Sequence, residues 1–167
     1  MKKLLLTTLA LALFPLFLSA QTVQKIGVVD TQSIFATMPE TKAAQTELDA
    51  LSGKYENEVA TMEAELKKQY EAYLKEAETL TDAMKQRKEQ DLEELQKRIY
   101  THRTVAQQDL QKKQAELLTP IQTKLKTAIN KVGTDNGFAY ILDANAMLFV
   151  GSNGQDITAL VRSALGL

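Results

Sequence analysis

The stretch "LDALSGKYENEVATMEAELKKQYEAYLKEA", residues 48–77, contains one glycine and no proline. Its apolar side chains recur at steps of 3, 4, 4, 3, 4, 4, 3 and 4 residues, the spacing of one face of an α-helix. They are Leu48, Leu51, Tyr55, Val59, Met62, Leu66, Tyr70, Tyr73 and Ala77. A repeat of eleven residues corresponds to about 3.67 residues per turn, so the apolar face runs nearly straight. The stretch predicts a long helix that packs along one narrow face.

The same repeat returns further along the chain and predicts a second long helix. Its apolar positions are Leu92, Leu95, Ile99, Ala106, Leu110, Leu117, Ile121, Leu125, Ala128 and Val132. Two positions of the repeat are polar, Arg103 and Gln114, so the contact between the helices is expected to be thin and able to bend. Pro120 removes a backbone donor inside this helix and predicts a kink.

The two helices are expected to form an antiparallel hairpin whose tip lies near residues 79–83. Threonine and aspartate in "TLTD", residues 79–82, are good N-caps, and Asp82 would begin the second helix. Residues 40–80 carry 10 acidic and 5 basic side chains, whereas residues 83–131 carry 6 acidic and 11 basic ones. Antiparallel packing would therefore pair opposite charges, each exposed pair adding about 0.2–1 kcal/mol. A single unbroken helix of about 90 residues is the alternative.

Short strands are expected on both sides of the hairpin. "KIGVVD", residues 25–30, predicts a strand, "TQSIFATMPE" predicts one short helical turn, and Pro39 is expected to begin the first long helix. "FAYILD", residues 138–143, and "AMLFV", residues 146–150, predict two strands joined by a tight turn.

The chain after these strands is expected to end in a short helix. Gly133 and Asn136-Gly137 would end the long helix before the strands, and "GSNGQD", residues 151–156, would turn into the last helix. Asp156 is its expected N-cap. The fold class is therefore α+β: a coiled-coil-like helical hairpin, residues 41–132, on a small body of residues 21–40 and 133–167.

The body is expected to associate with further copies of the chain. It has about 55 residues, and a domain of this size buries little surface by itself. Its strands are almost continuously apolar, which is typical of burial on both faces. We therefore expect an obligate homo-oligomer joined by Ile26, Val28, Phe138, Tyr140, Leu142, Met147 and Phe149.

The first twenty residues are typical of a secretory signal peptide. Lys2 and Lys3 precede a mostly apolar run of 15 residues, and Ser19-Ala20 offers a cleavage site after Ala20. The run is shorter than the roughly 20 residues that a membrane-spanning helix needs, which disfavours a membrane anchor. After removal of the signal peptide with its two lysines, the chain has 18 basic and 21 acidic residues, a net charge of −3. This charge gives no support for nucleic acid as a partner.

No catalytic or metal site is expected. Cysteine is absent and His102 is the single histidine, so no thiol nucleophile, thiolate site or histidine cluster can form. Asp30, Asp143 and Asp156 stand at the ends of expected elements, where aspartate usually caps. No phosphate-binding loop is found and no cofactor is implied. The basic stretch "KQRK", residues 85–88, lies near the expected tip and is a candidate for peripheral contact with membrane lipid.

In the order of its elements the chain resembles the Skp (OmpH) family of periplasmic chaperones. The resemblance is sharpest in "FAYILDANAMLFVGSNGQDITALV", residues 138–161, with "DANA" and "DIT" as its most specific matches, and extends to "IQTKLKTAI", residues 121–129. It implies a trimer whose bodies form a small β-barrel, with three hairpins enclosing a cavity. It also implies that unfolded outer-membrane proteins are held there without ATP, in the periplasm.

Several side chains of the hairpin are candidates for client contact. They are Tyr55, Met62, Leu66, Tyr70, Tyr73, Met84, Leu95 and Ile99. The best-known family members are strongly basic, whereas this mature chain is not, so no lipopolysaccharide site is transferred. The main alternative function is an exported coiled-coil spacer or assembly scaffold. An efflux-type adaptor would need further β-domains, and an enzyme is the least favoured class.

Overall fold

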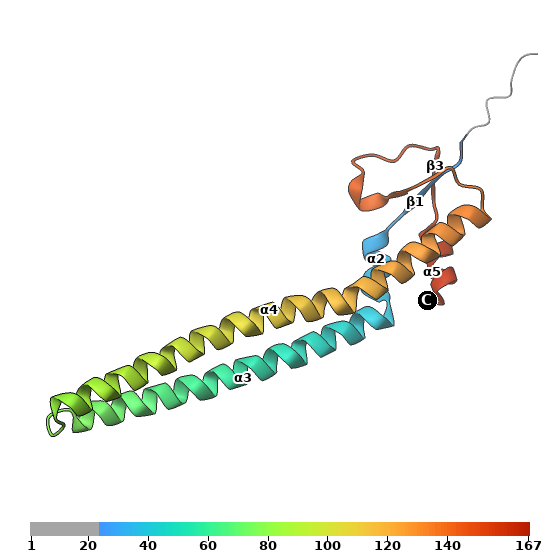
Figure 1. Cartoon of the computed structure of the whole chain (residues 1–167). Helices are drawn as coiled ribbons and strands as arrows, with labels where there is room; N and C mark the ends of the chain where they lie inside the picture. The colour runs from blue at the N-terminus through green and yellow to red at the C-terminus, as the bar shows by residue number, and fades with distance from the viewer. Residues whose placement is uncertain (1–23) are drawn as a thin grey trace, which may run out of the picture.

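The computed structural model describes residues 24–167, so the signal peptide expected over residues 1–20 lies outside the described residues. A long helical hairpin projects from a small body of strands and short helices at its open end (Figure 1). The hairpin consists of α3 (Pro39–Glu76) and α4 (Asp82–Asp135). The α+β fold class expected from the sequence, a helical hairpin on a small β-strand body, is confirmed.

The hairpin begins and turns at residues whose chemistry suits a helix end. Pro39 is the first residue of α3, where its missing N–H leaves no hydrogen bond unmade. The hydroxyl of Thr81 accepts a hydrogen bond from the Met84 backbone N–H and caps α4, which begins at Asp82. Between the helices, Thr79 N–H donates to Glu76 O at 2.9 Å. The chain therefore reverses here, in contrast to the alternative of a single unbroken helix.

The sheet of the body is parallel and has β1 at its centre. Its order is β2 (Tyr140–Asp143), β1 (Ile26–Val29) and β3 (Gly154–Asp156). Ile26 is aligned with Tyr140 on one side and with Gly154 on the other. Parallel neighbours need long connections, and the whole hairpin serves as the connection between β1 and β2.

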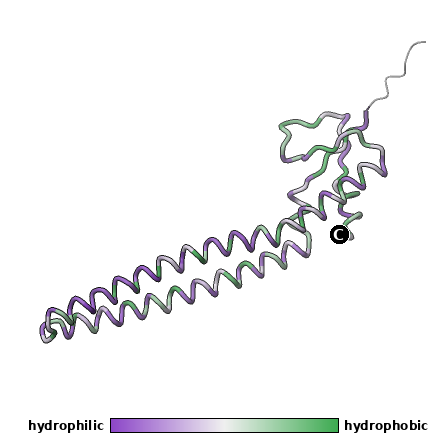
Figure 2. The backbone as a smooth tube through the Cα atoms, in the orientation of Figure 1, coloured by the Kyte–Doolittle hydropathy of each residue, from purple (hydrophilic) through white to green (hydrophobic). Residues whose placement is uncertain are grey.

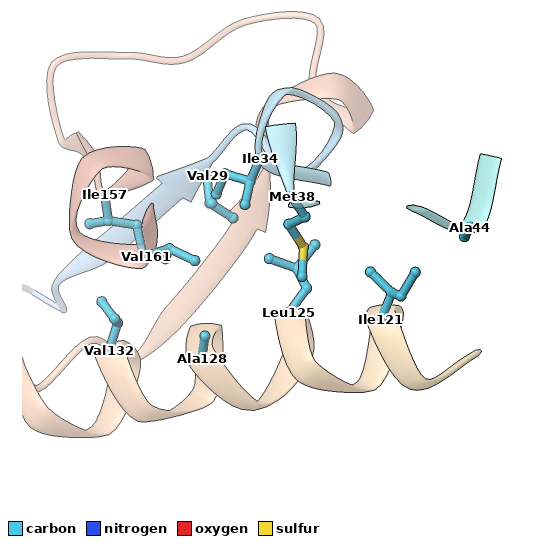
Figure 3. Packing of buried hydrophobic residues seen from close by; sticks show 10 residues of the cluster. All are labelled: Val29, Ile34, Met38, Ala44, Ile121, Leu125, Ala128, Val132, Ile157 and Val161. Carbon is cyan, nitrogen blue, oxygen red and sulfur yellow. The ribbon is translucent and has the colours of Figure 1, made fainter. Parts of the chain in front are cut away.

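The core of the body depends on the last turns of α4. Ile121, Leu125, Ala128 and Val132 point from this helix toward Val29, Ile34, Met38, Ile157 and Val161 (Figure 3). The side chains of Ile34, Met38, Ile157 and Val161 are fully buried there. We expected the boundary between hairpin and body to lie at residue 132, but the last turns of α4 before this residue pack into the core of the body. So small a body needs the apolar face of α4 to close its core.

The strand expected over residues 146–150 is wrong. Residues 144–146 form the 3₁₀ turn η2 (Ala144–Ala146), and the following segment forms no strand before β3. Asp143 Oδ1 accepts a hydrogen bond from Asn145 N at 3.1 Å, which bends the backbone out of the extended conformation. The free edge of β1 is instead paired by β3, a short polar strand that alternation of apolar residues could not indicate.

The role expected for Asp156 is also wrong in detail. Asp156 ends β3, and the N-cap of α5 (Thr158–Leu165) is Ile157, which makes no side-chain cap. Asp156 Oδ1 still accepts from Thr158 N at 2.9 Å, so the carboxylate satisfies one free N–H of the first turn. Gly154 is required at the start of β3, because a Cβ there would lie 2.6 Å from the Val150 side chain.

Two aspartates at the ends of neighbouring strands hold the body together. Asp30 Oδ1 accepts from Ser33 N at 2.9 Å and from the Asn145 amide at 3.0 Å. Asp143 accepts from the Thr31 hydroxyl at 2.6 Å and from the same amide at 3.1 Å. The hydrogen bonds from Ser33 and Asn145 hold the pKa of Asp30 below its usual range. The hydrogen bond from the Thr31 hydroxyl likewise lowers the pKa of Asp143.

We predict that Asp143→Asn destabilises the body in a pH-dependent way. A carboxyl whose folded pKa lies below its ordinary value of 3.8 contributes stability above that value and loses it as the pH falls through the folded pKa. The midpoint of thermal unfolding should drop by about 2–5 °C near neutral pH. The difference from the unsubstituted protein should shrink as the pH falls below about 4.

The matched control is Asp91→Asn, which removes an exposed carboxylate on α4. It should leave the midpoint almost unchanged. A loss of stability for Asp143→Asn that stays constant between about pH 7 and pH 3 would show that the carboxylate charge is not what stabilises the body.

Candidate functional site: the hairpin seam and the exposed side of the body

The apolar contact between α3 and α4, which we call the seam, is buried unevenly. On α4, Leu92, Leu95, Ile99 and Ala106 are buried. On α3 the corresponding row, which includes Leu48, Val59, Met62 and Leu66, is only half-buried. Figure 2 shows the hydrophobic positions recurring at intervals along both helices between hydrophilic ones. The apolar row of α3 therefore stays partly accessible although the hairpin is closed.

Ion pairs cross the seam along most of its length. Each joins an acidic residue of α3 to a basic residue of α4: Glu40 to Lys124, Glu47 to Lys113, Glu63 to Arg103, and Glu76 to Lys88. The carboxylate of Glu47 raises the pKa of Lys113, and the Lys124 ammonium lowers the pKa of Glu40. The opposite charges expected along an antiparallel seam are thus confirmed, and these exposed pairs mainly fix the register of the helices.

Two tyrosines of α3 lie across the seam and donate to carboxylates of α4. The Tyr55 hydroxyl lies 2.8 Å from Asp109 Oδ2, and the Tyr73 hydroxyl lies 2.5 Å from Glu89 Oε1. These hydrogen bonds raise the pKa of both phenols, because the neighbouring carboxylates oppose their ionisation. The seam is therefore filled twice in the same way, by a tyrosine ring whose hydroxyl donates a hydrogen bond to a carboxylate of the other helix.

His102 lies beside Tyr55 in the middle of the seam. Its Nε2 is 3.0 Å from Glu58 Oε2 but lacks the alignment of a hydrogen bond, and its ring meets the Tyr55 ring edge-on at 5.9 Å. In the part of the chain from residue 24 onward, no group of three or more His, Cys, Asp and Glu side chains could hold a metal ion.

The seam opens into grooves on both sides of Tyr55. One groove of about 380 Å³ extends from Ser52 and Tyr55 to the Glu63–Arg103 pair, and Ala60 and Ala106 are among its lining residues. We call it the seam groove. A second groove of about 560 Å³ lies between Glu47 and Asp109. One feature of the repeat indicates the seam groove: Arg103 is a polar position, and small Ala106 stands three residues later.

The candidate client residues of the hairpin fall into two groups. Tyr70 and Met84 are about half exposed, while Tyr55, Met62, Leu66 and Tyr73 are half-buried along the seam. Leu95 and Ile99, in contrast, have 5% and 6% of their surface exposed. Their expected contact with a client is therefore not possible while the hairpin is closed, because both side chains face α3.

The body exposes apolar side chains on the segment that follows β2 and on β2 itself. Phe149 is 84% exposed and Tyr140 is 59% exposed, and Leu142 is also exposed. Of the other residues expected to join copies, Ile26, Phe138 and Met147 are half-buried, and Val28 is buried within its own chain. Leu148, which is not among the residues expected to join copies, is fully exposed.

None of the helices described for residues 24–167 has the length and apolar character needed to cross a bilayer.

Comparison with known proteins gives one consistent result. The family model for outer membrane protein (OmpH-like) matches residues 25–165. The chaperone protein Skp of Pectobacterium atrosepticum is 26% identical over 141 residues, which cover 84% of this chain and 85% of that protein. A crystal structure of an OmpH-like outer membrane chaperone from Caulobacter crescentus has a TM-score of 0.75 at 16% identity, covering 85% of this chain and 83% of that one.

We predict that Tyr55 stabilises the middle of the hairpin through both its ring and its hydroxyl. Tyr55→Phe removes only the hydrogen bond to Asp109, which lies at the exposed edge of the seam, and should speed local exchange about twofold to fivefold. Tyr55→Ala should speed exchange further, since the ring between the two grooves is also lost. Hydrogen exchange of the backbone amides around residues 52–60 and 103–110 measures the effect.

The control is Tyr100→Phe, which changes a tyrosine that is 73% exposed on α4. Exchange in this variant should match that of the unsubstituted protein. Equal exchange rates in the Tyr55→Phe and Tyr100→Phe variants would contradict a structural role for the Tyr55 hydroxyl.

Proposed function

Because the chain belongs to the family of OmpH-like outer membrane proteins, we propose that it is a periplasmic chaperone that holds unfolded outer-membrane β-barrel proteins without ATP. The observation that carries this proposal is the half-buried apolar row of α3, which continues along a hairpin projecting far from the body. The relative from Pectobacterium atrosepticum, a chaperone by name, supports the same class of function. We assign the chain no catalytic residue.

The proposed binding mode is many weak contacts with no sequence requirement. An unfolded β-barrel chain presents alternating apolar side chains that aggregate unless they are covered. Met62, Leu66, Tyr70 and Tyr73 offer flexible and aromatic surface in one line along α3. Methionine and tyrosine adapt to varied partners, and such contacts are individually weak. Release then needs no nucleotide, because the client gains more stability by folding in the membrane.

We further propose that the working form is a homotrimer assembled through the bodies. Neighbouring copies would cover the exposed apolar side chains of the body, because such side chains are costly to leave in water. They are Phe149, Leu148, Tyr140 and Leu142. The unpaired edge of β2 offers backbone groups for a shared barrel. Three hairpins, each formed by residues 41–132, would then surround one cavity. The mature chain would begin at Gln21 and act in the periplasm.

Peripheral contact of the hairpin tip with membrane lipid is a weaker proposal. Within the basic stretch of residues 85–88, Lys88 is paired with Glu76 at 2.7 Å, and Lys85 is half-buried. The charge offered to lipid headgroups is therefore smaller than the sequence indicates.

A coiled-coil spacer or assembly scaffold is the second candidate function. The ion pairs across the seam favour it, since they stiffen the hairpin. A spacer has no use for the grooves beside Tyr55 or for the half-buried apolar row of α3, and these features favour the chaperone.

We predict that Phe149→Glu dissociates the trimer. Burying a carboxylate in an apolar contact is strongly unfavourable, so three copies should separate into single chains. Sedimentation velocity measures the change. The control is Tyr100→Glu, which places the same charge on an exposed position of α4 and should leave the assembly intact. Unchanged sedimentation of Phe149→Glu would contradict the proposed interface.

The proposed function is tested by suppression of aggregation. A urea-unfolded outer-membrane β-barrel protein is diluted into buffer with increasing amounts of the mature chain, without nucleotide, and light scattering is followed. We expect scattering to fall and to reach its minimum at about three chains per client. Scattering that stays unchanged at large excess would contradict the chaperone function and favour the spacer.

A further inference from the structure

The seam groove is shaped by small side chains between two polar ends. Ala60 of α3 and Ala106 of α4 leave room where larger residues fill the seam elsewhere. Tyr55 stands at the end nearer the body, and the Glu63–Arg103 ion pair stands at the end nearer the tip. From Ser52 to Glu63 the groove extends over roughly 16 Å of helix, which matches about five residues of an extended chain.

The hairpin itself shows which kind of side chain such a space accepts. Tyr55 and Tyr73 each lie across the seam with the hydroxyl donating to a carboxylate of the opposite helix. The apolar ring covers neighbouring apolar surface while the hydroxyl stays paired at the rim. The seam groove has the same kind of lining, apolar walls with carboxylates at the rim, and no side chain of this hairpin fills it.

Glu56 is the carboxylate at the rim with acceptor capacity to spare. Glu63 is already paired with Arg103. Glu56 Oε1 accepts one hydrogen bond, from the Ser52 hydroxyl at 3.0 Å. A carboxylate has about four acceptor positions on its two oxygens, so a further O–H or N–H donor can bind there. Glu56 gives the rim a negative charge that favours a donor and disfavours an acidic occupant.

We propose that the seam groove is a subsite for a tyrosine or tryptophan side chain of an extended client segment. The ring lies against Ala60 and Ala106, and its hydroxyl or indole N–H donates to the carboxylate of Glu56. This inference rests on the proposed function, because the segment belongs to an unfolded outer-membrane β-barrel protein. Barrels of that class carry girdles of aromatic residues on strands whose side chains alternate between apolar and polar.

The occupant follows from the chemistry of the groove. Glu56 repels a carboxylate, and the apolar walls formed by the alanines and Val59 make it costly for any charged side chain to enter the groove. An aliphatic side chain fits the apolar walls but leaves the Glu56 carboxylate without a new donor. A tyrosine or tryptophan satisfies both the walls and the rim, as Tyr55 and Tyr73 do in the seam.

The test uses short peptides and the whole mature chain in its native assembly. The probe is a peptide of about nine residues that alternates alanine and serine with tyrosine at its centre, together with versions that carry phenylalanine or leucine there. Binding is titrated by the NMR shifts of the Ala60 and Ala106 amides. We expect shifts at these amides and a dissociation constant about threefold lower for the tyrosine than for the phenylalanine peptide.

Two pairs of variants separate the groove from the rest of α3. Ala60→Leu fills the groove and should weaken the tyrosine peptide about tenfold, whereas Ala64→Leu, one turn further and outside the groove, should not. Glu56→Ala removes the acceptor and should abolish the preference for tyrosine over phenylalanine, while Glu65→Ala, outside the groove, should retain it. Helix content by circular dichroism verifies that each variant is folded.

Failure of this inference can be told apart from failure of the proposed function. Equal effects of Ala60→Leu and Ala64→Leu, or equal affinities for the tyrosine and phenylalanine peptides, would overturn the subsite even if the protein suppresses aggregation. Conversely, loss of binding in Ala60→Leu alone would support the subsite. If the protein then failed to suppress aggregation, only the chaperone function would be contradicted.

Discussion

Helix α4 packs against two different parts of the molecule, α3 and the body, and this constrains the whole structure. The first part of α4 forms the seam with α3, and its last turns form a wall of the body, where Ile121, Leu125, Ala128 and Val132 are buried. The body could not close a core without this wall, because its strands are short and its other helices are small. Continuity of α4 therefore ties the direction of the hairpin to the sheet, and the hairpin projects as an extension of the core.

The seam depends on a different balance of forces. Leucines and isoleucine of α4 are buried, yet most of the row they meet on α3 is only partly buried, so the apolar contact alone holds the helices weakly. Ion pairs and tyrosine hydroxyls at the edges fix which residues face each other. The result is a hairpin that is specific in register but incompletely covered, which suits a surface for transient and varied apolar contacts.

The sequence predicted best where one physical pattern acted alone. The eleven-residue repeat indicated both helices, Pro39 and Asp82 are their first residues, and "KIGVVD" contains β1. The family resemblance is also confirmed. Prediction failed where the structure of a segment depends on contacts with residues distant in sequence. "AMLFV" has strand-like residues but pairs with no strand among residues 24–167, whereas polar "GQD" pairs with β1 because the turn at residues 151–154 brings it there. Likewise, the periodicity of α4 could not separate Leu95 and Ile99, which face α3, from side chains open to a client.

We propose that unfolded client is held along the half-buried row of α3. Photo-crosslinking tests it most directly, with a photoreactive side chain placed at Leu66 on the row or at Lys67 beside it, where the chain faces solvent. We expect an unfolded β-barrel protein to cross-link strongly to position 66 and weakly to position 67, and both cross-links to disappear once the client has folded. Equal cross-linking at the two positions, or cross-linking that persists with folded client, would contradict it.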